Sequence, residues 1–208
     1  MTQKASAYEA ARRRGRDELR TTVLDTASRL LAAEGAGALT MRRIATELGS
    51  STTVLYTMFG GKHGLAEALY LEGFERFRRR MESAPPDPDP LAEMYRISWA
   101  YRDYALTERN YYKVMFAEAI PGFTPSEDAL AVANASFEIL IDAARACVDA
   151  GTFAPGDPAE IAVVLWSAAH GMVSLELAGH FDGVDARRHY ETAVTAATSW
   201  FLRSGPDQ

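Results

Sequence analysis

Apolar residues recur every three or four positions through most of the chain, and this spacing predicts α-helices. The first clear example runs from Asp17 to Glu34, and Gly35 and Gly37 then end it. No stretch alternates apolar and polar residues as a half-buried strand would. The pattern therefore predicts an all-α fold with about nine helices. The inward positions of the first helix are Val23, Ala27, Leu30 and Leu31.

Two short helical patterns meet at a Gly-Ser-Ser turn between Thr40 and Phe59. Hydroxyls suited to capping a helix precede each pattern, and Gly49 breaks the first. Such a pair predicts a helix-turn-helix, because a short second helix fits the DNA major groove, which is about 12 Å wide. The capping residues are Thr40 and Ser51, the inward positions are Ile44, Ala45, Leu48, Val54, Leu55 and Phe59, and the outward positions of the second helix are Thr52, Thr53, Tyr56 and Thr57.

A longer helix is expected from the glycines at 60 and 61 to about Met81, with Tyr70, Phe74, Phe77 and Met81 inward. The segment from Ser83 to Pro90 cannot propagate a helix, because its prolines lack amide donors and fix φ. A domain boundary is expected near it. Further helices are expected over 91–106, 111–117 and 125–150, followed by two more.

Charge divides the chain into a basic head and an acidic body. Residues 1–62 hold 10 Lys and Arg against 6 Asp and Glu, whereas residues 63–208 hold 12 against 22. This division suits a protein that touches a polyanion with one end. The arginines of residues 1–16 indicate a basic flexible arm, which either follows DNA phosphates or only aids solubility: Arg12, Arg13, Arg14 and Arg16.

The composition excludes several classes of protein. A hydrophobic content of 48% allows a sizeable core and excludes a disordered chain. The apolar runs are shorter than a membrane span, which argues against a transmembrane helix. The basic N-terminal residues are not followed by an apolar segment, so they do not resemble a secretory signal. The single cysteine, Cys147, cannot form an internal disulfide. We therefore expect a cytoplasmic protein without a transmembrane helix.

The stretch LTMRRIATELGSSTTVLYTMFGGKHGL, from Leu39 to Leu65, resembles the signature of the tetracycline-repressor (TetR) family of transcriptional regulators. The likeness implies that Tyr56 and Lys62 contact phosphates and that Arg42, with Thr52 and Thr53, lies nearest the bases. The sequence departs from the family pattern at Thr53, Met58 and Gly61. The full set of expected DNA-binding residues is Thr40, Arg42, Arg43, Ser51, Thr52, Thr53, Tyr56, Thr57 and Lys62.

A second likeness concerns the C-terminal part. The stretch from Trp166 to Phe181 resembles the Trp-x-x-x-His-Gly domain of one TetR subgroup, and the likeness implies that the last two helices pair with those of a second subunit. From Ile161 to Leu177 the helix is apolar on two faces and must be covered on both. A two-fold dimer would place two recognition helices on successive major grooves. The interface candidates are Ala193, Ala196, Ala197, Trp200 and Phe201.

Aromatic residues of the body have the composition of a small-molecule pocket, although aromatic residues at helical spacing also serve as ordinary core. The pocket candidates are Trp99, Tyr104, Tyr111, Tyr112, Phe116, Phe137, Trp166 and His170. We expect no catalytic activity, no bound metal and no cofactor. The sequence shows no nucleophile beside a general base, no cluster of metal-ligand residues and no phosphate-binding loop.

The sequence thus predicts a DNA-binding domain over residues 17–77 and a ligand-binding and dimerisation domain over 84–204. The hypothesis is a homodimeric repressor that a small-molecule effector releases from a near-palindromic DNA operator. The alternative is a helical protein-binding scaffold without a DNA function.

Overall fold

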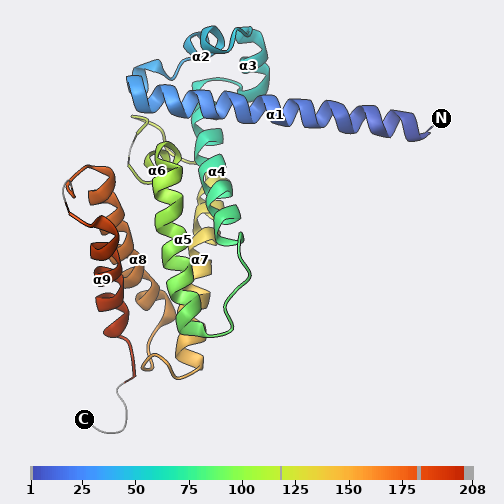
Figure 1. Cartoon of the computed structure of the whole chain (residues 1–208). Coiled ribbons are helices and arrows are strands. Elements are labelled where there is room, and N and C mark those ends of the chain that lie inside the picture. The colour runs from blue at the N-terminus through green and yellow to red at the C-terminus, as the bar shows by residue number, and fades with distance from the viewer. Residues whose placement is uncertain (1, 118, 182–183, 204–208) are drawn as a thin grey trace. The chain divides into compact units, whose positions relative to one another are not determined.

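The computed structural model describes residues 2–117, 119–181 and 184–203, and describes side chains from residue 7 onward (Figure 1). These residues form nine α-helices and one short 3-10 helix, and a single isolated bridge joins Phe153 to Leu202. The predicted all-α fold is confirmed. The helices are α1 (Thr2–Glu34), η1 (Ala36–Ala38), α2 (Met41–Leu48), α3 (Thr52–Phe59), α4 (Lys62–Met81), α5 (Pro90–Thr107), α6 (Arg109–Phe116), α7 (Glu127–Asp149), α8 (Pro158–Leu177) and α9 (Ala186–Ser199).

The chain divides into two compact units. Unit 1 comprises residues 1–73 and 110–129, and unit 2 comprises residues 74–109 and 130–208. Helices α4 and α7 each contribute residues to both units. The functional ranges 1–16, 17–77 and 84–204 stay predictions, and residues 1, 118, 182, 183 and 204 within them lie outside the described part of the chain.

Unit 1 is built on the second half of α1. Val23, Leu24 and Ala27 are completely buried there, together with Leu55 of α3 and Leu65 of α4. Figure 1 shows α2 and α3 on one side of α1, with the N-terminal part of α1 extending past them. The C-terminal half of α1 is therefore the scaffold on which the short helices are placed.

The first helix is longer than predicted. A flexible arm was expected before a helix that begins near Asp17, but α1 begins at Thr2 and is 33 residues long. Residues 2–16 are rich in Ala and Arg, which favour helix, and contain no proline. Because the second half of α1 is anchored in the core, these residues extend an existing helix without a new nucleation step. The lack of apolar periodicity before Asp17 therefore reflected the lack of a packing partner for this part of the chain. It did not reflect a lack of helix.

Unit 2 joins α5, α8 and α9. Asp89 and Asp157 cap α5 and α8 through their carboxylates, and each is followed by a proline at the first helical position. The Tyr190 hydroxyl of α9 donates to the Ser98 carbonyl oxygen at 2.7 Å, and it also lies 2.8 Å from the Ser98 hydroxyl of α5. These contacts fix α9 beside α5 within the unit.

A buried ion pair joins α5 to α8. Arg102, only 8% exposed, donates to both carboxylate oxygens of Glu176 at 2.6 and 3.0 Å. Its guanidinium also lies over the ring of Tyr190, 5.6 Å from the centroid. A buried charge is costly unless nearby groups neutralise it. The positions of Glu176 and Tyr190 around Arg102 therefore fix the register of α5, α8 and α9 in unit 2.

Helix α8 corrects two expectations. At 20 residues it is long and apolar enough to cross a membrane by length and composition, so the argument that its apolar run is too short was wrong. Its Ile161, Leu165 and Val173 are nevertheless buried inside unit 2. Val164 and Leu175, predicted on the same face as Ile161 and Leu165, are instead 47% and 45% exposed.

Candidate DNA-binding surface

Helices α2 and α3 form the helix-turn-helix predicted from the sequence. The Thr40 side chain accepts a hydrogen bond from the Arg43 amide at 3.2 Å, and the Ser51 side chain accepts one from the Thr53 amide at 3.1 Å. Gly49 ends α2 in the left-handed conformation, with φ 59°. Both predicted caps are confirmed, and they fix where the two short helices begin.

The outer face of α3 is broad. Thr53, Tyr56 and Thr57 are exposed, as predicted, while Leu55 and Phe59 anchor the helix in the core. Val54 was expected to face inward, but it is 38% exposed and lies on the outer face. On a helix with only eight residues, two buried anchors four positions apart are sufficient, and the residue before the first anchor turns away from the core.

The two arginines at the start of α2 differ in their surroundings. Arg42 is exposed, and no ion pair is described for it. Arg43 binds the carboxylates of Glu34 in α1 and Glu47 in α2, with closest distances of 2.7 and 2.8 Å. Arg29 of α1 also donates to Glu47, at 2.7 Å. Arg43 is therefore engaged in a network that joins α2 to α1.

The same network shifts the titration of its carboxyl groups. Hydrogen bonds from Arg43 lower the pKa of Glu34, and those from Arg43 and then Arg29 lower the pKa of Glu47. Both carboxylates are thus ionised at neutral pH and neutralise positive charge on this side of the motif. Free positive charge on α2 is provided by Arg42.

Lys62 begins α4 close to the end of α3. Its side chain is exposed, and Nζ lies 3.5 Å from the Ala36 carbonyl oxygen. Gly64, the third residue of α4, has no room for a side chain, because an added Cβ would overlap the Phe59 carbonyl oxygen. This close approach brings Lys62 and the free amides of the first turn of α4 next to α3, and free amides there favour an anion.

The eight aromatic pocket candidates are divided between the two units. Tyr111, Tyr112 and Phe116 belong to unit 1, where the Tyr111 hydroxyl donates to Asp25 at 3.0 Å. Trp99, Tyr104, Phe137, Trp166 and His170 belong to unit 2. Tyr104, Tyr111 and Tyr112 are almost fully buried, so their rings are core. Whether the others line a pocket stays a prediction.

A hydrogen-bonded chain lies at the centre of the unit 2 aromatic group. The Trp166 indole donates to the Tyr101 hydroxyl at 3.3 Å, and that hydroxyl lies 2.9 Å from Nδ1 of His170. Burial lowers the pKa of His170, which favours the neutral ring, so we assign Nδ1 as the acceptor of the Tyr101 proton. Sequence reasoning missed Tyr101, although it lies three positions before Tyr104 on the same helix.

The interface candidates lie on the outside of unit 2. Trp200 is 84% exposed, Ala196 is exposed and Ala193 is half-buried. Phe201 is the exception, because its ring packs against Phe153 at 6.0 Å between centroids. Sequence reasoning missed Val163, which is 48% exposed and lies beside Val164 on α8.

The thiol of Cys147 is the one cysteine side chain of the protein. Cys147 is completely buried in α7, and burial together with the charge of Asp89 raises the pKa of its thiol to about 11. Among the described residues, no group of three or more His, Cys, Asp and Glu side chains is arranged to hold a metal ion.

Solved structures with the same fold come from several bacteria. A protein of unknown function from Rhodococcus sp. RHA1 is 25% identical, with a TM-score of 0.75, over 89% of this chain and 96% of that one. SmeT, in complex with triclosan, is 17% identical, with a TM-score of 0.65, over 89% and 92%. NalD of Pseudomonas aeruginosa, the secondary repressor of the MexAB-OprM multidrug efflux pump, is 18% identical, with a TM-score of 0.67, over 91% and 98%.

No curated protein matches the chain significantly in sequence. Two family models match it: residues 23–69 match the bacterial regulatory proteins of the tetR family, and residues 94–197, half of the chain, match the tetracyclin repressor-like C-terminal domain. The first match covers the helix-turn-helix and the start of α4, and the second covers most of α5 to α9. The chain therefore belongs to the TetR family of bacterial transcriptional regulators.

Proposed function

We propose that the protein is a homodimeric repressor that binds a near-palindromic operator and is released from it by a small molecule. The observation that carries the proposal is the outer face of α3. Thr53, Val54, Tyr56 and Thr57 are exposed together on a short helix that is capped at its start and anchored by two buried residues. A rigid, exposed helix of this size is suited to the major groove.

The chemistry of this face matches DNA. Threonine hydroxyls can donate to and accept from base edges, and the exposed Val54 offers apolar surface to a thymine methyl group. Arg42 and Lys62 flank the helix with positive charge, and Tyr56, 55% exposed, can donate its hydroxyl proton to a phosphate. The face thus combines groups that can specify a sequence with groups that position the protein on the backbone.

Dimerisation is supported by the apolar surface of unit 2. Val163, Val164 and Leu175 of α8 are each more than two-fifths exposed, as is Trp200 just after α9. Exposed apolar side chains on adjacent helices favour association, because burying them releases water. A two-fold dimer through α8 and α9 would present two α3 helices to successive major grooves.

An effector site is proposed in unit 2 around Tyr101, Trp166 and His170. Phe137 packs on Trp166 at 5.7 Å, so the cluster combines aromatic surface with polar groups, as small-molecule sites do. Among proteins with this fold, SmeT is seen with triclosan and NalD is named as a repressor, and both support a repressor with a small-molecule ligand. The likeness to the Trp-x-x-x-His-Gly subgroup stays a prediction, as does the identity of the effector.

The proposed repressor acts by binding alone. It binds without chemical turnover, requires no metal or cofactor, and acts in the cytoplasm, where bacterial DNA lies. A catalytic protein would turn over substrate, whereas this one binds its effector stoichiometrically. The buried thiol of Cys147, with its raised pKa, is unsuited to nucleophilic chemistry.

A mobility-shift assay with fragments from upstream of the protein's own gene tests DNA binding. Specific retention of a fragment is expected, and Tyr56→Phe with Lys62→Gln should weaken binding to every sequence and flatten its salt dependence. No retention of any fragment at low salt would contradict the proposal. A partner protein that remains bound after nuclease treatment would favour the scaffold alternative.

Sedimentation of two matched variants tests the interface. Val164→Asp places a charge on the exposed face of α8 and should give a monomer. Val132→Asp makes the same change at a valine of α7 that is 43% exposed, and should leave the dimer intact. Dimers of equal strength in both variants would exclude this face as the interface.

A further inference from the structure

The N-terminal half of α1 carries a stripe of arginines. Arg12, Arg13 and Arg16, with Glu9, line one shallow groove on α1, and Arg20 continues the same face. Residues spaced three and four apart lie on one side of a helix, and four residues advance along it by about 6 Å. The stripe therefore presents positive charges in a row along one face of α1.

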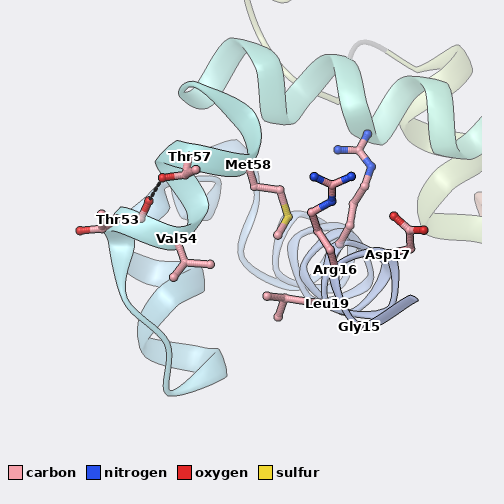
Figure 2. A pocket seen from close by; sticks show the side chains of 9 residues that line it. Gly15, Arg16, Asp17, Leu19, Thr53, Val54, Thr57 and Met58 are labelled. Carbon is pink, nitrogen blue, oxygen red and sulfur yellow. Dashed lines mark hydrogen bonds between the residues drawn. The ribbon is translucent and has the colours of Figure 1, made fainter. Parts of the chain in front are cut away.

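This stripe is continuous with the outer face of α3. A groove of about 680 Å³ in unit 1 is lined by Arg16 and Arg20 of α1 on one side and by Thr53, Val54 and Thr57 of α3 on the other. Figure 2 shows Arg16 and Leu19 of α1 across from Val54 and Met58 of α3. A ligand that occupies this groove beside Thr53 and Thr57 would therefore also lie against Arg16 and Arg20.

The stripe arginines are not engaged by acidic partners in the way Arg43 is. No ion pair is described for Arg12, Arg13 or Arg16 within the described residues, and their side chains are exposed. Like charges at four-residue spacing, as in Arg12 and Arg16, weaken a helix in the absence of an anion. Asp17 at the edge of the groove and Glu9 offset only part of this charge.

We propose that the stripe of Arg12, Arg13 and Arg16 is a second DNA-binding element, which contacts the sugar-phosphate backbone of one strand beside the base pairs that α3 contacts. The inference rests on the proposed operator binding by α3. DNA carries one phosphate per strand about every 3.4 Å along its axis, so arginines about 6 Å apart can each meet a separate phosphate. Because the stripe is helical and anchored through α1, it needs no folding on binding.

The occupant of the groove is argued from charge and continuity. A polyanion matches the arginines, and the groove opens onto hydroxyls of the helix proposed to enter the major groove. A merely solubilising arm would have no preferred face. Arg14 provides the comparison, because two positions along a helix rotate a side chain by about 200°, which places Arg14 opposite Arg12 and Arg16.

The test measures the salt dependence of DNA affinity by fluorescence anisotropy with the full chain. Arg16→Gln is compared with Arg14→Gln, since each removes one positive charge from the same helix and glutamine keeps a similar helix propensity. The probes are a fragment that the wild type binds and a random-sequence duplex of equal length. Circular dichroism confirms that helix content is unchanged.

Arg16→Gln should make the slope of log affinity against log salt shallower by about 0.9 on both probes, and adding Arg12→Gln should raise the change to about 1.8. Arg14→Gln should change the slope far less. Equal effects of Arg14→Gln and Arg16→Gln, or no effect of either while the wild type binds, would overturn the inference and leave operator binding intact. Failure of the wild type itself to bind DNA would instead overturn the proposed function.

Binding of wild type and variants to vesicles that contain anionic lipid separates DNA from a membrane surface. We expect no difference between Arg16→Gln and Arg14→Gln in this assay. Loss of vesicle binding in Arg16→Gln, with unchanged DNA binding, would assign the stripe to a membrane and contradict the inference.

Discussion

Arg43 donates two hydrogen bonds to the carboxylate of Glu34, at 2.7 and 3.2 Å, and so ties the start of α2 to the end of α1. The Arg43 side chain donates a further hydrogen bond to the carboxylate of Glu47, at 2.8 Å. A guanidinium held in this way is less available to a phosphate than that of its neighbour Arg42. We therefore expect these two neighbouring arginines of α2 to differ in role: Arg42 is available to DNA, and Arg43 holds α2 to α1.

Replacing each arginine with glutamine tests this difference. Arg42→Gln should weaken DNA binding and make its salt slope shallower by about 0.9, as for one lost phosphate contact. Arg43→Gln should leave the slope nearly unchanged and lower the thermal midpoint, because Glu34 loses its ion pair and Glu47 keeps only the one with Arg29. The reverse order of effects on the slope would show that Arg43 leaves its network to bind DNA.

Val54→Thr tests whether the unexpected exposure of this valine has a role in sequence preference. The change keeps the side chain's shape but replaces one methyl group with a hydroxyl, so an apolar contact worth about 0.8 kcal/mol with a thymine methyl would be lost. Affinity for the best-bound fragment should fall about fourfold, with the salt slope and random-duplex binding unchanged. Val132→Thr, at an exposed valine of α7, is the control and should change neither. A uniform loss on all sequences would contradict a base contact.

Gly64→Ala tests the close approach of α4 to α3. The added methyl group would overlap the Phe59 carbonyl oxygen, so the helices must separate, and unfolding should require about 1–3 kcal/mol less. Gly15→Ala is the control, because a Cβ added at this position of α1 would meet no side chain and no other element within 4 Å, and alanine favours helix. Chemical denaturation measures both. An unchanged or raised stability in Gly64→Ala would show that α4 begins elsewhere in solution.

The pH dependence of stability should report His170. Burial places its pKa in the folded state below the ordinary value of 6.5, so the unfolded chain takes up this proton more readily. The free energy of unfolding should therefore decrease as pH falls below about 6.5, when protonation also removes the Nδ1 acceptor from Tyr101. His170→Gln should flatten this dependence between about pH 7 and pH 5. An equally steep dependence in the variant would assign it to other groups.

Cys147 should be inert until the protein unfolds. Its side chain is completely buried, and its thiol pKa is raised to about 11, so neither access nor thiolate is available near pH 8. A chromogenic disulfide reagent should label no thiol in the native protein and one per chain in denaturant. Cys147→Ser should abolish the labelling in denaturant. Rapid labelling of the native protein would show that α7 opens locally.

Local patterns in the sequence determined the helices and the motif. Hydrophobic periodicity, the hydroxyls of Thr40 and Ser51 and the glycine at 49 are short-range signals, because caps and turns depend on residues a few positions apart. The same signals carried the likeness to the TetR family through Leu39 to Leu65. They failed at residues 2–16, where helix without packing left no periodic trace.

Only the tertiary structure decided which polar and apolar groups are available. Arg42 and Arg43 are alike in sequence, yet Glu34 of another helix holds one of them. Val54 and Val164 follow helical spacing, yet both are exposed, because a face is buried only if another element covers it. Burial and ion pairing depend on residues far apart along the chain, whereas caps depend on neighbours. The sequence therefore determined where the DNA-binding helix begins and ends, and the fold determined which of its side chains face outward.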